Sequence, residues 1–221
     1  MNADGAEFFS YPDITWQAEL PPVLYPVPAR YARDLEVGAE LTVGLPGGYY
    51  IHGQVLARED RETITLPRET EPSEALGISA PLHWWMAKAY PDTGITMQWW
   101  PVDYAWVYRD GISPDATTST PPEGATPRSW LDEVSPSLDE PPTRRPRPAR
   151  EAGGLIGRAL RVQHAPGKWS WRVAVSEPVD VDGDISVQVL PPSVWWITQV
   201  TFYGEVRDQL ETLPIHRLFA Y

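Results

Sequence analysis

The chain has 221 residues, 42% of them apolar, which is enough for folded cores and excludes wholesale disorder. It has no cysteine, which excludes a disulfide framework and thiol-rich zinc sites. The formal charge is −12, and residues 1–112 hold 16 acidic against 7 basic side chains. Because acidic surfaces repel phosphate backbones, we expect no nucleic-acid partner. The charge is interpreted as solubilising, with DNA mimicry or docking on a basic partner as alternatives.

The N-terminal region shows no leader or membrane signal. Acidic residues recur through the first thirty positions without an apolar h-region, and no apolar run approaches the roughly 18–20 residues that span a bilayer. We therefore expect no signal peptide, no membrane contact and synthesis in a cytoplasm. Residues 1–33 are predicted to form an extended arm, since proline at this density excludes a helix or a central strand. Such an arm lies in a groove on its own fold or on a neighbour.

Two later regions, residues 34–112 and 154–221, repeat the same landmarks in order, which indicates an internal duplication. Each has a short apolar strand, a Pro-Gly turn, an alternating strand, a strand ending in Leu-Pro, and a Trp doublet. The matched segments are 41–43 with 160–162, 46–56 with 166–176, 63–67 with 187–191, and Trp84-Trp85 with Trp195-Trp196. A rival alignment matches the last doublet to Trp99-Trp100.

The repeated regions are predicted to be small β-barrels. Trp169, Trp171 and Val173 alternate with other residues, the pattern of a strand with one buried face. Asp182-Gly183 suits the positive φ angles of a type I′ hairpin. Four or five short strands with tight turns favour an SH3-like barrel or a small sandwich. The predicted fold is therefore all-β, with two related SH3-like small β-barrels, the N-terminal arm and a Pro-rich linker.

The first region holds about 13 additional residues between its Leu-Pro landmark and its Trp doublet. They are interpreted as an insertion that includes a short helix from Ser79 to Ala89, before Pro91 ends it.

Residues 113–153 form the Pro-rich linker, with nine prolines and few aliphatic side chains. In isolation it should be mobile or polyproline-like, because it buries too little surface to offset its ordering entropy. A partner that holds the linker in place would imply a large assembly.

The eleven tryptophans are the main functional signal. Neighbours on a strand point to opposite faces, so one ring of each Trp doublet should leave the core. An exposed indole needs a cover, which the arm, the insertion, the other barrel, a protein partner or a sugar can supply. The candidate protein-interaction residues are Trp16, Tyr25, Trp85, Trp100, Trp130, Arg144, Arg145, Arg147 and Trp196.

The sequence contains no nucleophile elbow, zinc-protease helix, P-loop or dinucleotide fingerprint. Asp180, Asp182 and Asp184 are spaced like cation ligands, but the glycine and closing glutamate of a calcium loop are out of place, which favours a hairpin tip. We predict no enzyme activity, no cofactor and no metal.

These features favour a non-enzymatic assembly protein that binds other proteins through its arm, linker and exposed tryptophans. The Arg-, Pro- and Ala-rich composition is typical of a GC-rich genome, and we expect a bacteriophage virion component in capsid decoration, tail or connector. It would be found in the virion or in the host cytoplasm during assembly, bound to other proteins or to copies of itself. Alternatives are an acidic inhibitor or immunity protein that masks a basic partner, and a carbohydrate-binding module.

Overall fold

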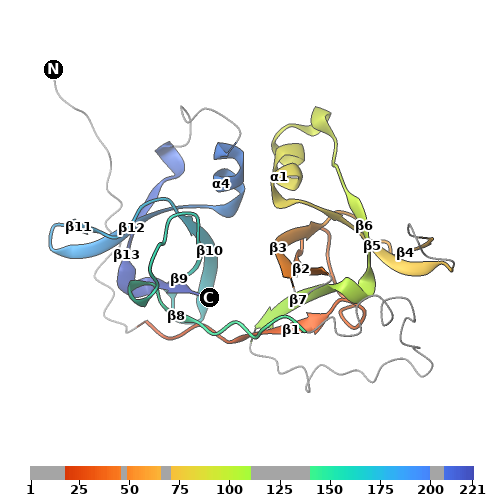
Figure 1. Ribbon diagram of the computed structural model, residues 1–221. Coiled ribbons are helices and arrows are strands. Elements are labelled where there is room, and N and C mark those ends of the chain that lie inside the picture. The colour runs from red at the N-terminus through yellow and green to blue at the C-terminus, as the bar shows by residue number, and fades with distance from the viewer. Residues whose placement is uncertain (1–17, 46–48, 66–70, 111–139, 200–206) are drawn as a thin grey trace.

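A computed structural model describes residues 18–45, 49–65, 71–110, 140–199 and 207–221 (Figure 1). The architecture is mainly β, with two curled antiparallel sheets that each form a half-barrel. The half-barrels lie side by side in Figure 1, and the all-β prediction with two β units is confirmed at this level.

The first half-barrel has the strand order β1-β7-β2-β3-β5-β4, with β6 also paired to β5. Its proline-bearing strand β1 lies at the edge, where the missing N–H groups cost no ladder bond. The strands are β1 Leu24–Pro28, β2 Glu40–Leu45, β3 Tyr49–Leu56, β4 Glu62–Ile64, β5 Ser73–Ser79, β6 Gln98–Pro101 and β7 Ala105–Asp110.

The second half-barrel has the order β8-β14-β9-β10-β12-β11, with β13 also paired to β12. Taken in chain order, its strands occupy the same positions as those of the first sheet. The strands are β8 Arg147–Pro148, β9 Ala159–Ala165, β10 Lys168–Ala174, β11 Val179–Val181, β12 Asp184–Leu190, β13 Glu211–Pro214 and β14 Leu218–Ala220.

In the part of the chain that the structure describes, each half-barrel carries one α-helix, and the two helices contact each other (Figure 1). They are α1, Pro81–Ala89, and α4, Pro192–Thr198. The helix predicted up to Ala89 is confirmed. The described residues also contain short 3₁₀ turns: η1 Pro91–Thr93, η2 Val102–Tyr104, η3 Ala149–Glu151, η4 Arg207–Gln209 and η5 Ile215–Arg217.

The Trp doublets at 84–85 and 195–196 lie in these helices, so the strand alternation predicted for them is wrong. Pro81 and Pro192 stand in the first turn of each helix, where their fixed φ favours helix, and this outweighs the strand preference of tryptophan. The third doublet, Trp99-Trp100, lies on β6 as strand alternation requires.

The landmark alignment also needs a correction after the alternating strand. β12, which contains Val187 to Leu190, occupies the sheet position of β5 and not that of the segment 63–67. The connection between β4 and β5, residues 65–72, therefore corresponds to the two-residue turn between β11 and β12. Because α1 follows β5 as α4 follows β12, the helix is not part of an insertion. The hairpin predicted at Asp182-Gly183 is confirmed, with φ angles of 55° and 92° between β11 and β12.

Each half-barrel has its own core, filled from the inner face of its sheet. The first core includes Val43, Leu76 and Ile78, and the second includes Val162, Val187 and Leu213. One tryptophan from each helix packs on a glycine with positive φ. Trp84 lies over Gly38 and Trp195 over Gly157, so each helix is seated on its own barrel.

Candidate protein-interaction site

Two extended segments join the half-barrels, and we call them the first strap (residues 18–28) and the second strap (residues 140–148). They run antiparallel where they meet. The Leu24 N–H donates to the Arg144 carbonyl and the Arg144 N–H to the Leu24 carbonyl, both at 2.9 Å. Figure 1 shows the straps passing along one side of both sheets.

Each strap begins on one half-barrel and ends on the other. The Tyr221 hydroxyl of the second half-barrel donates to the Pro22 carbonyl at 2.6 Å, and the Tyr108 hydroxyl of the first donates to the Pro142 carbonyl at 2.8 Å. After crossing, the first strap becomes β1 beside β7, and the second becomes β8 beside β14. The straps are thus exchanged reciprocally between the half-barrels.

Aromatic pairs stand on the sheet faces that point away from the cores. Trp106 alternates with core residues of β7 and meets Tyr50 edge to face, with ring centroids 6.2 Å apart. Phe219 alternates with core residues of β14 and meets Trp169 at 5.7 Å. Trp106 and Phe219 are both buried although they lie outside the cores.

The second strap anchors on the first half-barrel through Arg144. Its guanidinium lies 3.9 Å from the centre of the Tyr108 ring, a cation–π contact, and donates to His52 Nδ1 at 2.5 Å and to Thr42 Oγ1 at 3.4 Å. Because arginine only donates, His52 Nδ1 must be an acceptor, which places the proton of the neutral ring on Nε2.

The protonation states agree with this arrangement. Burial, and then the positive charge of Arg144, lower the pKa of His52, so the neutral ring is favoured. Burial raises the pKa of Tyr108, which keeps its hydroxyl protonated as the donor to Pro142.

The first strap anchors on the second half-barrel without a charge. Leu24 is only 3% exposed, and the Glu19 N–H donates to the Oε1 of the buried Gln163 side chain on β9 at 2.9 Å. Trp171 and Tyr221 are in ring contact nearby, with Arg161 over Trp171. Hydrogen bonding fixes the strap backbone, and apolar burial fixes its crossing point.

A polar cross-link ties β9, β10 and β13 together in the second half-barrel. The His164 Nε2 and Ser170 Oγ atoms are 2.6 Å apart, and Arg172 donates to the same hydroxyl at 3.1 Å and pairs with Glu211 at 2.9 Å. Burial, and then Arg172, lower the pKa of His164. The Ser170 hydroxyl is thus bonded by His164 of β9 and Arg172 of β10, and we interpret this cluster as a structural link between strands.

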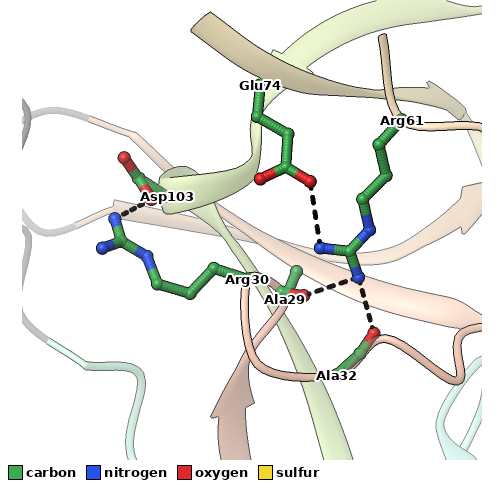
Figure 2. A network of polar contacts seen from close by, with 6 residues as sticks. All are labelled: Ala29, Arg30, Ala32, Arg61, Glu74 and Asp103. Carbon is green, nitrogen blue, oxygen red and sulfur yellow. Dashed lines mark hydrogen bonds and ion pairs between the residues drawn. The ribbon is translucent and has the colours of Figure 1, made fainter. Parts of the chain in front are cut away.

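A second network holds the end of the first strap (Figure 2). Arg61 donates to the Ala29 and Ala32 carbonyls at 3.1 and 2.8 Å and pairs with Glu74 at 3.3 Å. Arg30 forms an ion pair with Asp103, whose side chain is nearly buried. The turn that follows β1 is therefore neutralised and fixed by side chains of three other segments.

The structure brings some predicted interaction residues together and separates others. Arg144, Arg145 and Arg147 lie on the second strap, and Tyr25 lies half buried on β1, next to the strap crossing. Trp16 and Trp130 fall outside the described residues.

The other predicted residues are tryptophans that the fold itself covers in part. Trp85 and Trp196 are half buried on the contacting helices α1 and α4, and Trp100 packs against the first core. Every tryptophan in the described ranges is buried or half buried.

Sequence reasoning missed Tyr108, Tyr221, His52 and Leu24, although a signal for the straps was present. The segment PPVLYPVPARYA at 21–32 recurs as PPTRRPRPAREA at 141–152, with four prolines, two alanines and an arginine in the same places. The arm and the linker are both recognisable as proline-rich, but the duplication was sought only in the residues between and after them, so the shared framework of the two straps went unnoticed.

No protein-family model matches the chain, and the comparisons with curated proteins and with solved structures give no match either. Within the described ranges, none of the helices has the length and apolar character needed to cross a bilayer. The same ranges contain no group of three or more His, Asp or Glu side chains placed to hold a metal ion.

Proposed function

We propose that the protein is a non-enzymatic assembly protein that binds other proteins, and that it serves as a virion component of a bacteriophage, in capsid decoration, tail or connector. One observation carries this proposal. Proline-rich segments lie extended across a folded unit other than their own and are held by tyrosine hydroxyls, as Pro22 is by Tyr221 and Pro142 by Tyr108. Extended proline-rich segments on aromatic surfaces are a recurring mode of protein recognition.

We further propose that each half-barrel is an SH3-like barrel and that the two arose by duplication. The equivalent strand orders and the recurrence of the strap sequence support this origin. The exchange of straps within one chain supports the proposal that related surfaces hold similar extended segments of neighbouring proteins.

The test is fractionation of particles from the bacterium that expresses the chain. A tagged chain should co-sediment with particles in a density gradient and remain with them after nuclease treatment and a salt wash. The control is a tagged cytoplasmic enzyme of similar mass. Recovery of the chain only in the free-protein fractions, while particles form normally without it, would contradict the proposal.

A further inference from the structure

Three exposed arginines, Arg145 and Arg147 of the second strap and Arg150 of the following turn η3, form what we call the arginine ridge. Arg145 and Arg147 alternate with half-buried residues on an extended backbone, so they project to the same side, and Arg150 follows with a side chain 67% exposed. Among the described residues, Arg145 and Arg147 have no ion-pair partner, and Arg150 has only its neighbour Glu151 at 3.9 Å.

The first half-barrel does supply a carboxylate to the arginine that corresponds to Arg150. Arg30 occupies the place that Arg150 has in the repeated strap sequence, and Arg30 pairs with Asp103. The register of η2 and η5 puts His216 where Asp103 stands. In the second half-barrel, Arg150 therefore lacks the nearly buried carboxylate that Asp103 gives Arg30, and keeps only the exposed contact with Glu151.

The opposite edge of the same sheet is acidic. β8 and β11 are the two ends of the second sheet, and the β11–β12 hairpin carries Asp180, Asp182 and Asp184, all exposed. No lysine or arginine occurs between Arg172 and Arg207. Val179 and Ile185 on this hairpin are 43% and 45% exposed, which adds apolar area beside the charges.

We propose that the arginine ridge of one copy binds the acidic β11–β12 hairpin of a second copy, in a head-to-tail contact. The hairpin projects outward from the body of the molecule in Figure 1, so it is free to reach a neighbour. Because ridge and hairpin are different surfaces, the contact is heterologous, and its repetition gives a ring or a filament. A phosphate backbone fits the ridge less well, since the chain as a whole carries −12.

This inference deepens the proposed assembly function and rests on it, and it is tested on the purified full chain without particles. Sedimentation velocity at low and high salt should show association of the wild type that salt weakens. The variant Arg145→Glu/Arg147→Glu should associate at least about tenfold more weakly. Its matched control, Arg33→Glu/Lys168→Glu, makes the same charge change at exposed positions elsewhere and should behave as wild type.

A second variant alters the hairpin while keeping its fold. Asp180→Asn retains the oxygen that accepts from the Gly183 N–H, and Asp184→Lys reverses an exposed charge. By itself, this Asp180→Asn/Asp184→Lys variant should also self-associate at least about tenfold more weakly than the wild type. Mixed with the ridge variant, it should form a one-to-one dimer, because each variant keeps the surface that the other has lost.

Several outcomes would overturn the inference. They are a monomeric wild type at low salt, association that the ridge variant retains, a mixture of the two variants that stays monomeric, or a ridge that binds duplex DNA in the absence of self-association. A chain that co-sediments with particles but is monomeric when purified would refute the head-to-tail contact and leave the proposed function standing. A chain that self-associates through these surfaces but never enters particles would support the head-to-tail contact and contradict the proposed function.

Discussion

The two straps share one proline framework and differ in the side chains that it carries. Leu24, Tyr25 and Val27 of the first strap are replaced by Arg144, Arg145 and Arg147 of the second. The backbone path is nevertheless the same, from a tyrosine hydroxyl on one half-barrel to an edge strand on the other. The prolines thus set the path, and the side chains decide whether the crossing is apolar and buried or cationic and partly open.

The largest effect is expected when Leu24 of the first strap is replaced by arginine, the residue at the corresponding position 144 of the second strap. Leu24→Arg places a charge where the leucine side chain is 3% exposed, at the point where the two straps pair. We expect a loss of unfolding free energy on the order of 3 kcal/mol or more. Guanidinium unfolding followed by tryptophan fluorescence measures it.

The control for this prediction is Leu24→Met, which keeps the volume and should cost less than about 1.5 kcal/mol. If Leu24→Arg costs no more than this control, the crossing point tolerates charge on both straps and the contrast between them disappears.

The contact between a helix tryptophan and a glycine in each half-barrel allows a second comparison. A Cβ at Gly38 would lie 3.2 Å from Trp84, against 3.6 Å between Gly157 and Trp195, and both glycines have positive φ. Gly38→Ala should therefore cost about 2–3 kcal/mol and Gly157→Ala about 1–2 kcal/mol. Thermal unfolding of the two variants shows which substitution destabilises more. A larger effect of Gly157→Ala would show that the contact between Gly38 and Trp84 relaxes more easily.

Removing the tyrosine hydroxyl that holds the beginning of each strap tests whether the two straps depend equally on that hydrogen bond. Tyr108→Phe and Tyr221→Phe each remove a donor to a strap carbonyl, and each should cost about 1 kcal/mol. Urea titrations of both single variants and of the double variant provide the measurement. A cost confined to one tyrosine would mean that only one strap depends on its hydrogen bond.

The smallest expected effect is on pH dependence at the cationic crossing. His52 has a lowered pKa when folded, so the unfolded chain binds more protons, and stability falls as the pH drops below the ordinary histidine value. Arg144→Leu removes the nearby charge and should raise the pKa of His52 toward that value. NMR titration of the ring protons measures the shift, and His164 serves as the internal control because its lowered pKa has other causes. An unchanged His52 pKa would leave burial as the whole cause.

The sequence predicts the strands of this fold better than their connections. Period-two patterns identified β10, and Asp182-Gly183 identified the β11–β12 hairpin, because both signals are local. The doublet helix α4 was missed since its seven residues give too short a window for a helical period. The strap exchange could not be derived, because Tyr221 and Pro22 meet only through tertiary packing.

The pairing of Tyr221 with Pro22 also bears on how the protein is made. The two residues are 199 positions apart, so at about 5–20 residues per second roughly 10–40 s of translation separate them on the ribosome. During that interval the Pro22 carbonyl cannot yet accept the hydrogen bond from Tyr221. The attachment of the first strap to Tyr221 is therefore a late event in biosynthesis. Until then, this proline-rich strap is accessible to chaperones or assembly partners that act on the nascent chain.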